Sequence, residues 1–81
     1  DKQVVRWRRL LHEMEELKSF TPLSRIPRLS PTLVHTYGQM NPKTLIRDLA
    51  GLMERGLMEH DRSGYRVVRT PIRPFATDLL R

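Results

Sequence analysis

The sequence contains no cysteine, and this absence excludes disulfide bonds, thiolate zinc sites and cysteine nucleophiles. It also has no apolar run that approaches the roughly 20 residues of a membrane-spanning helix. No signal peptide is visible in the first residues. We therefore expect a cytoplasmic protein that does not enter a membrane, since a reducing compartment is compatible with a chain that lacks cysteine. Because the first residue is not Met, we also expect the sequence to be either a processed product or, in preference, a piece of a longer protein.

Recognisable catalytic motifs are missing as well. The histidines, His12, His35 and His60, are isolated in the sequence and lack the spacing of metal ligands. There is no glycine-rich phosphate loop, nucleophile elbow or pair of carboxylates at a catalytic spacing. We therefore expect neither enzyme activity nor a metal site nor a cofactor.

The chain is short and basic. Its 81 residues suffice for one small domain, and its formal net charge is +6. A positive excess favours a polyanionic partner because Lys and Arg neutralise phosphates, although many small soluble domains are basic for solubility alone. The charge is spread evenly over the two halves of the chain, so it does not locate a binding face.

The clearest pattern in the sequence predicts a helix that begins after Asn41 and ends before Gly56. Asn41 is a favourable N-cap residue, and Pro42 suits the first helical position because its missing N–H costs nothing there. Gly56 supplies the left-handed residue that commonly ends a helix. Apolar residues recur at steps of three and four and form one stripe. These residues are Leu45, Ile46, Leu49, Leu52 and Met53.

A β-hairpin is predicted directly after this helix. Residues 57–60 and 65–69 are short strand candidates on either side of the turn-forming sequence Asp61-Arg62-Ser63-Gly64. Tyr65 and Val67 alternate onto one face and should cover the core.

The first half of the chain predicts two more helices. Residues 2–19 have an apolar face on which Trp7 is the expected core anchor. Residues 20–30 contain prolines and predict an irregular connector. Ser30-Pro31 repeats the capped helix start, and the helix over 31–37 should turn Leu33, Val34 and Tyr37 inward.

This succession resembles a winged helix-turn-helix, and the resemblance covers residues 30–69. The run of Thr44, Arg47, Asp48, Leu49, Leu52, Gly56 and Leu57 is similar to many prokaryotic winged-helix domains. It is most like the winged-helix domain that follows the catalytic core in many Fic-family proteins, although the His-Pro-Phe catalytic loop of that family is missing here. The resemblance implies a mainly α fold with a small β-hairpin (α+β), made of three helices and a two- or three-stranded wing. It also implies that the last few residues of the connector form a short strand that pairs with the hairpin.

The expected single domain, residues 1–81, then has five parts. Residues 1–19 form helix one, 20–30 the connector, 31–56 the helix-turn-helix, 57–69 the wing and 70–81 a tail. Phe75, Leu79 and Leu80 make the tail apolar, and we expect it to pack on helix one or to contact a second copy (a homodimer) or an adjacent domain.

The resemblance implies a DNA-binding module, either a transcription-regulator-type domain or the DNA-reading part of a larger protein. In such a module the helix after Asn41 enters the major groove of double-stranded DNA. We expect this helix to turn Gly51 and Glu54, besides the basic residues, toward solvent. Arg47 is long enough for a guanine edge or a phosphate. The predicted DNA-binding residues are Lys43, Thr44 and Arg47 on the helix and Arg62 and Arg66 on the wing.

Two acidic residues and Gly51 on the same helix do not fit DNA binding by the whole helix. Asp48 and Glu54 would repel phosphates, and Asp48 is expected to pair with a basic neighbour close in sequence if its role lies in the fold. Gly51 costs helix stability and predicts the close approach of another backbone. An alternative function therefore stays open: a protein-interaction or regulatory winged helix that controls an attached, Fic-like catalytic domain.

Overall fold

The structure is a computed structural model, and it describes residues 1–68. These residues form α1 (Lys2–Met14), the 3₁₀-helix η1 (Leu23–Arg28), α2 (Pro31–Tyr37), α3 (Pro42–Glu54), β1 (Met58–Asp61) and β2 (Gly64–Val67). The predicted class, mainly α with a small antiparallel hairpin, is confirmed for this part of the chain. Arg69 and the tail at 70–81 lie outside the described residues.

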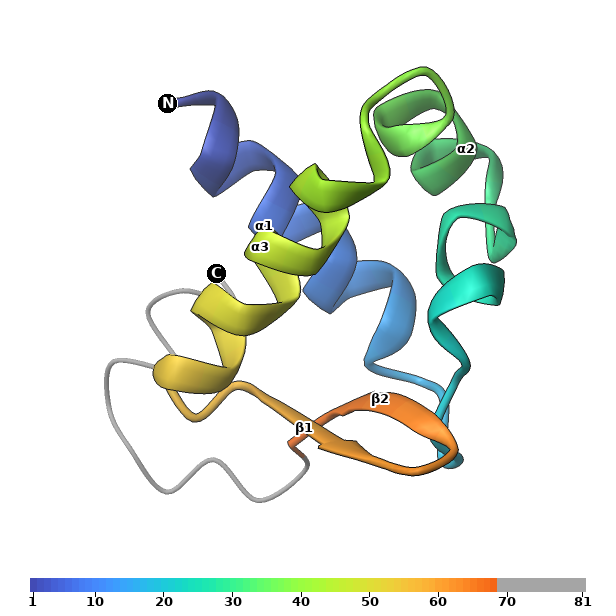
Figure 1. Cartoon of the computed structure of the whole chain (residues 1–81), viewed down its shortest axis with the longest axis vertical. Coiled ribbons are helices and arrows are strands. Elements are labelled where there is room, and N and C mark those ends of the chain that lie inside the picture. Colours follow the sequence, from blue (N-terminus) through green and yellow to red (C-terminus); the bar gives the residue numbers. More distant parts are fainter. Residues whose placement is uncertain (69–81) are drawn as a thin grey trace.

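The helices enclose one core, and the hairpin closes one end of it. α1 and α3 pack against each other, α2 and η1 lie along one side, and the hairpin crosses beneath α3 (Figure 1). Trp7 is buried, as predicted. The buried apolar side chains of residues 1–68 are Trp7, Leu10, Leu11, Met14, Ile26, Leu33, Tyr37, Leu45, Leu49, Leu52, Leu57, Met58 and Val67.

The predicted caps of α2 and α3 are confirmed. The Ser30 hydroxyl accepts a hydrogen bond of 3.2 Å from the backbone N–H of Leu33, and the Asn41 side chain accepts one of 2.9 Å from Lys43 N–H. Each proline that follows lies in the first turn, where no N–H is needed. After α3 the chain turns at Gly56, whose φ of 73° is in the left-handed region.

α1 is shorter than predicted and ends at Met14 instead of residue 19. The N–H of Leu17 donates to the carbonyl of Met14 at 3.1 Å, so the chain tightens into a turn at that point. This turn directs the following residues toward the hairpin. Thr21 is buried there, and it exchanges backbone hydrogen bonds of 2.8 and 2.9 Å with Tyr65.

The prediction of a strand in the last residues of the connector is wrong. Leu23–Arg28 is a 3₁₀-helix that buries Ile26 under α2, and the pairing with the hairpin is an isolated bridge at Thr21. The physical reason is the position of the prolines. Pro22 and Pro27 lack the N–H groups that a continued strand would donate, so the pairing ends before Pro22.

Two apolar side chains that were predicted to face inward are exposed. Val34 on α2 is 50% exposed and Ile46 on α3 is 44% exposed. In α3 the inward stripe is centred on Leu45 and Leu49, and each residue is rotated by about 100° from the one before it, so Ile46 lies to the side. In α2 the buried positions after Leu33 belong to Thr36 and Tyr37.

The hairpin is anchored by Gly64, which lies against the connector. β1 and β2 pair with Met58 opposite Val67 and Asp61 opposite Gly64. As predicted, Val67 is buried, while Tyr65 is half-buried and stacks on His60 with 4.3 Å between ring centroids. Gly64 has a φ of 145°, and a Cβ atom there would lie 2.0 Å from the carbonyl oxygen of Thr21.

Gly64→Ala should therefore destabilise the protein by about 2 kcal/mol or more, because the new methyl group meets backbone and the φ angle disfavours any L side chain. Urea denaturation would measure the loss. Ser63→Ala is the matched control in the same turn, and we expect it to stay within about 0.5 kcal/mol of wild type because Ser63 is exposed. Equal stabilities of the two variants would contradict the close packing of Gly64 on Thr21.

Candidate nucleic-acid interface

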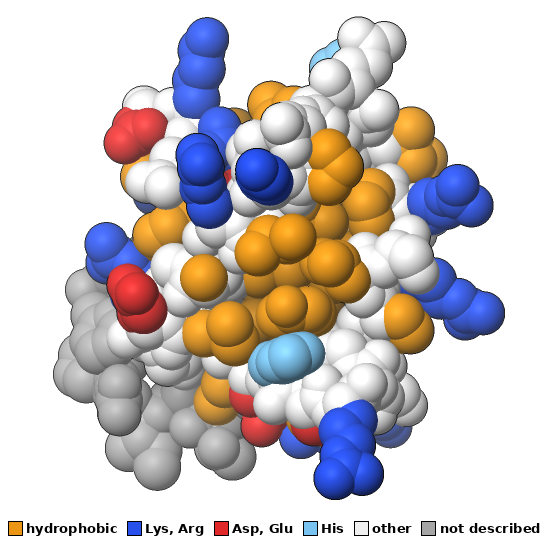
Figure 2. All heavy atoms as spheres, viewed as in Figure 1, with side chains coloured by type: hydrophobic (Ala, Val, Ile, Leu, Met, Phe, Trp, Pro, Cys, Tyr) orange, Lys and Arg blue, Asp and Glu red, His pale blue; other side chains and the backbone are white. Residues whose placement is uncertain are grey.

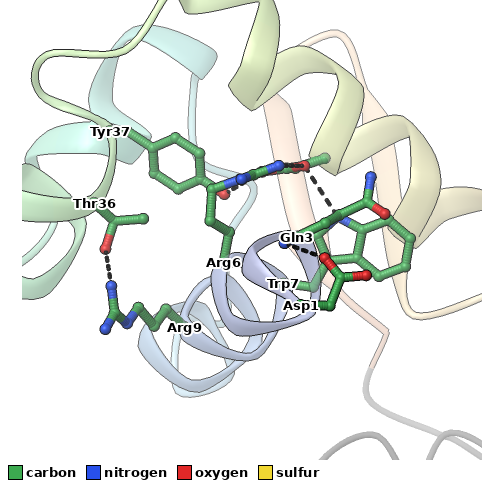
Figure 3. A network of polar contacts seen from close by, with 8 residues as sticks. Asp1, Gln3, Arg6, Trp7, Arg9, Thr36 and Tyr37 are labelled. Carbon is green, nitrogen blue, oxygen red and sulfur yellow. Dashed lines mark hydrogen bonds and ion pairs between the residues drawn. The ribbon is translucent and has the colours of Figure 1, made fainter.

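Asp48 is the buried centre of a polar network that joins the three α-helices. Its carboxylate is 1% exposed and accepts hydrogen bonds from Arg6 Nε at 2.7 Å and Arg6 Nη2 at 3.2 Å. Trp7 Nε1 donates to the same carboxylate at 3.1 Å, and the Tyr37 hydroxyl donates at 2.7 Å. The three side chains converge on it from α1 and α2 (Figure 3).

Two predictions about Asp48 are thus wrong. The side chain does not point to solvent, where it would repel phosphates, and it does not pair with a basic residue close in sequence. Its partner Arg6 lies 42 residues earlier in the chain. The physical reason is that Asp48 lies in the inward stripe of α3, between Leu45 and Leu52, so its carboxylate has to be neutralised by another helix.

The network favours the protonated forms of Arg6 and Tyr37. The pKa of Arg6 is raised, chiefly by its hydrogen bond to Asp48, so the guanidinium stays charged. The pKa of Tyr37 is raised above its ordinary value, chiefly because burial disfavours the phenolate and then through the hydrogen bond to Asp48. In residues 1–68, no buried side-chain nitrogen or oxygen lacks a hydrogen-bond partner.

Gly51 explains how Trp7 reaches this network. A Cβ atom at Gly51 would lie 2.4 Å from Cζ2 of the Trp7 ring, so the close approach that we predicted there involves a side chain and not a backbone. The guanidinium of Arg55 lies 5.0 Å from the ring centroid of Trp7, where a cation is attracted to the aromatic face. Gly51 is therefore half-buried under Trp7 and does not face solvent.

The outward face of α3 carries the predicted basic residues. Lys43 and Arg47 are exposed and lie one helical turn apart. Within residues 1–68 neither side chain makes a hydrogen bond or an ion pair with another residue. Thr44 is half-buried at the edge of this face, and the acidic residue Glu54 is exposed about two turns further on. The first two turns thus expose positive charge without a negative neighbour.

The two hairpin arginines differ in their surroundings. Arg62 is exposed in the turn between β1 and β2. Arg66 is half-buried, pairs with Glu59 at 3.1 Å and donates to the backbone carbonyl of Lys18 at 3.3 Å. Its guanidinium also lies 4.2 Å from the ring centroid of Phe20. Arg66 therefore holds the hairpin to the connector.

The sequence contained a signal for the partners of Asp48 that our interpretation missed. Asp48 falls at the i+3 position between Leu45 and Leu52 of an apolar stripe, and an acid in such a stripe requires a cation or several donors. Arg6 and Trp7 are adjacent on α1, at the edge of its apolar face, and could have been proposed as donors. Nothing in the local sequence indicated Tyr37.

Neither a metal site, nor a membrane-spanning helix, nor a similar known protein was found for the described residues 1–68 or in the comparisons. In residues 1–68, no three His, Asp or Glu side chains come together as metal ligands would. No helix of that part of the chain has the length and hydrophobicity to span a membrane. Comparisons with protein-family models, curated proteins and solved structures gave no match. The resemblance to winged-helix domains, including those of Fic-family proteins, stays a prediction.

Asp48→Ala should destabilise the protein by about 3 kcal/mol, because it leaves Arg6 without its counter-charge and removes the acceptor of Trp7 and Tyr37. The measurement is the free energy of unfolding in urea. Glu54→Ala removes an exposed carboxylate from the same helix and should change stability by less than about 0.5 kcal/mol. Similar losses in the two variants would show that the buried network does not contribute to the free energy of unfolding beyond what an exposed carboxylate contributes.

The raised pKa of Tyr37 predicts a loss of stability at alkaline pH. The unfolded chain releases the Tyr37 proton above about pH 10, whereas the folded protein retains it. Stability is therefore fully present below about pH 10 and falls by about 1.4 kcal/mol per pH unit above it. The contribution of Tyr37 to this slope should be absent from Tyr37→Phe, so the difference in stability between wild type and variant should fall by about 1.4 kcal/mol per pH unit above about pH 10. Tyr65→Phe is the control, since Tyr65 is outside the network, and an unchanged slope in Tyr37→Phe would refute the prediction.

Proposed function

We propose that the chain is a winged helix-turn-helix module that binds double-stranded DNA, with α3 as its recognition helix. The observation that carries this proposal is the withdrawal of Asp48 into the core, where Arg6 neutralises it. Lys43 and Arg47 therefore present positive charge on the outward face of α3 without the exposed carboxylate that Asp48 would otherwise place beside Arg47. Arg62, exposed in the hairpin turn, adds a third cation.

The chemistry of these residues fits a nucleic-acid backbone. Lys43 is a mobile point charge that suits phosphates, and Arg47 can contact a phosphate or both acceptors of a guanine edge. The start of α3 adds the partial positive charge of a helix N-terminus near Lys43. The recognition helix of a helix-turn-helix protein contacts bases with its N-terminal residues, and Lys43 and Arg47 lie in that part of α3.

The structure narrows the set of residues in the proposal. Arg66 is engaged with Glu59, Lys18 and Phe20, so we assign it to the fold and not to DNA. Glu54 limits the proposed contact to the first two turns of α3. Three phosphate contacts by one small module support weak binding with a marked dependence on salt.

Fluorescence anisotropy with a labelled mixed-sequence duplex would test the proposal. If Lys43, Arg47 and Arg62 each neutralise one phosphate, affinity should fall about 40-fold between about 50 and about 200 mM salt. Arg47→Ala should weaken binding at low salt and reduce that fall to about 12-fold, because one fewer counterion is displaced.

Arg8→Ala is the matched control, because Arg8 is exposed on α1 and is not part of the proposed face. It should bind the duplex like wild type, and circular dichroism should show that both variants are folded. If no binding occurs at low salt, or Arg8→Ala weakens binding as much as Arg47→Ala does, α3 is not the DNA-binding element.

A further inference from the structure

An apolar groove lies between η1, α2 and the start of α3. It has a volume of about 630 Å³, and Leu23 and Pro27 form one wall. Val34, Tyr37 and Met40 come from α2 and the turn after it, and Leu45 comes from α3. Figure 2 shows apolar side chains gathered between α3 and η1, with Lys and Arg side chains on either side. This surface adjoins the outward face of α3 that carries Lys43 and Arg47, and neither of these two residues lines it.

The groove exposes large apolar side chains to water. Val34 is 50% exposed and Met40 is 42% exposed, and both line the groove. Tyr37 and Leu45 are buried and give it a fixed floor, since their positions are set by core packing. A contiguous apolar surface of this kind commonly marks a binding site, whereas a single exposed apolar residue does not.

The charges at the groove are all positive. None of the residues that line it is acidic, and one of them is Arg28. Arg25 is exposed three residues earlier on the same 3₁₀-helix, and Lys43 follows the lining residue Pro42 on the opposite wall. An apolar surface with a basic edge is complementary to an apolar segment with acidic flanks.

We infer that this groove is the docking site for an acidic amphipathic helix of a partner protein. The large apolar side chains of the helix enter between η1 and α2, and its Asp or Glu residues meet Arg25 and Arg28. Recognition of this kind uses anchors at helical spacing in an apolar groove. The basic edge favours acidic partners and disfavours basic ones through like-charge repulsion.

Charge distinguishes this occupant from segments of the chain itself. Residues 69–81 carry Arg69, Arg73 and Arg81 against the single acid Asp78, so the tail is positive and does not complement the groove. A second copy is also unsuitable over residues 1–68. Outside the groove its exposed large apolar residues are Val5 and Ile46. Val5 borders a hollow in which Lys2 and Arg9 outnumber Asp1, and Ile46 precedes Arg47 in the sequence, so neither offers an acidic apolar segment.

The probe for the test is a labelled synthetic peptide of about 14 residues, roughly four helical turns, with Leu and Phe on one face and Glu on the other. Anisotropy with the full 81-residue chain should show saturable binding that weakens with salt. The same peptide with Lys in place of every Glu should not bind. No binding of the acidic peptide, or equal binding of the basic one, would overturn the inference.

Matched variants locate the binding. Val34→Asp should weaken binding of the peptide at least about tenfold, whereas Val5→Asp, at a valine of similar exposure outside the groove, should leave it unchanged. Arg28→Glu should weaken binding about fivefold, and Arg8→Glu should not. Equal effects within either pair would overturn the proposed location. Arg47→Ala should leave peptide affinity unchanged, so this test is independent of DNA binding.

Two further outcomes would identify a different occupant. The double variant Phe75→Asp/Leu79→Asp should bind the peptide like wild type, and a gain in affinity would mean that the tail competes for the groove. Light scattering should show that the wild type is monomeric. A wild-type dimer that Val34→Asp dissociates would assign the groove to a second copy. Either result would overturn the inference of an acidic partner.

Discussion

The hydrogen bonding of the Asp48 carboxylate is the constraint on which the arrangement of the helices depends. The carboxylate belongs to α3, and it accepts three hydrogen bonds from α1 and one from α2. A buried carboxylate is unfavourable unless it is paired and hydrogen-bonded, so a sliding or rotation of any of these helices would leave a charge or a donor without its partner. Burial of the apolar core favours packing of the three helices in general, and the carboxylate selects one rotation of α3 among the possible packings.

The rotation of α3 determines what the surface of the protein offers. With Asp48, Leu45 and Leu49 turned inward, Lys43 and Arg47 face outward. The same rotation places Leu45 beside Tyr37, where both form the floor of the apolar groove. The cationic face and the groove therefore both depend on the network of Asp48, although neither includes its carboxylate.

Local chemistry explains which features could be predicted from the sequence. The N-caps at Ser30 and Asn41 and the turn at Gly56 involve neighbouring residues, so a short sequence specifies them. The partner of Asp48 and the contacts of Arg66 with Lys18 join residues more than 40 positions apart, and no local pattern contains that information. Ile46 was misplaced for another reason: it lies at the margin of an apolar stripe, where packing of the neighbouring helix decides its exposure. The position of Arg47 was thus predictable, and the place of Asp48 in the apolar stripe indicated that its carboxylate needs donors, whereas the tertiary arrangement decides which residues donate to it.

The two proposed surfaces are neighbours, and this has a thermodynamic consequence. Pro42 lines the groove, and Lys43, the next residue, belongs to the cationic face. Acidic residues of a helix in the groove would lie close to Lys43, at a range where charges in physiological salt still interact. They would lower the positive potential that attracts phosphates, so the partner helix would weaken DNA binding. By linkage, DNA would weaken binding of the partner helix by the same factor. Two surfaces that share the start of α3 therefore favour alternate occupancy over simultaneous occupancy, and high salt should reduce their mutual exclusion.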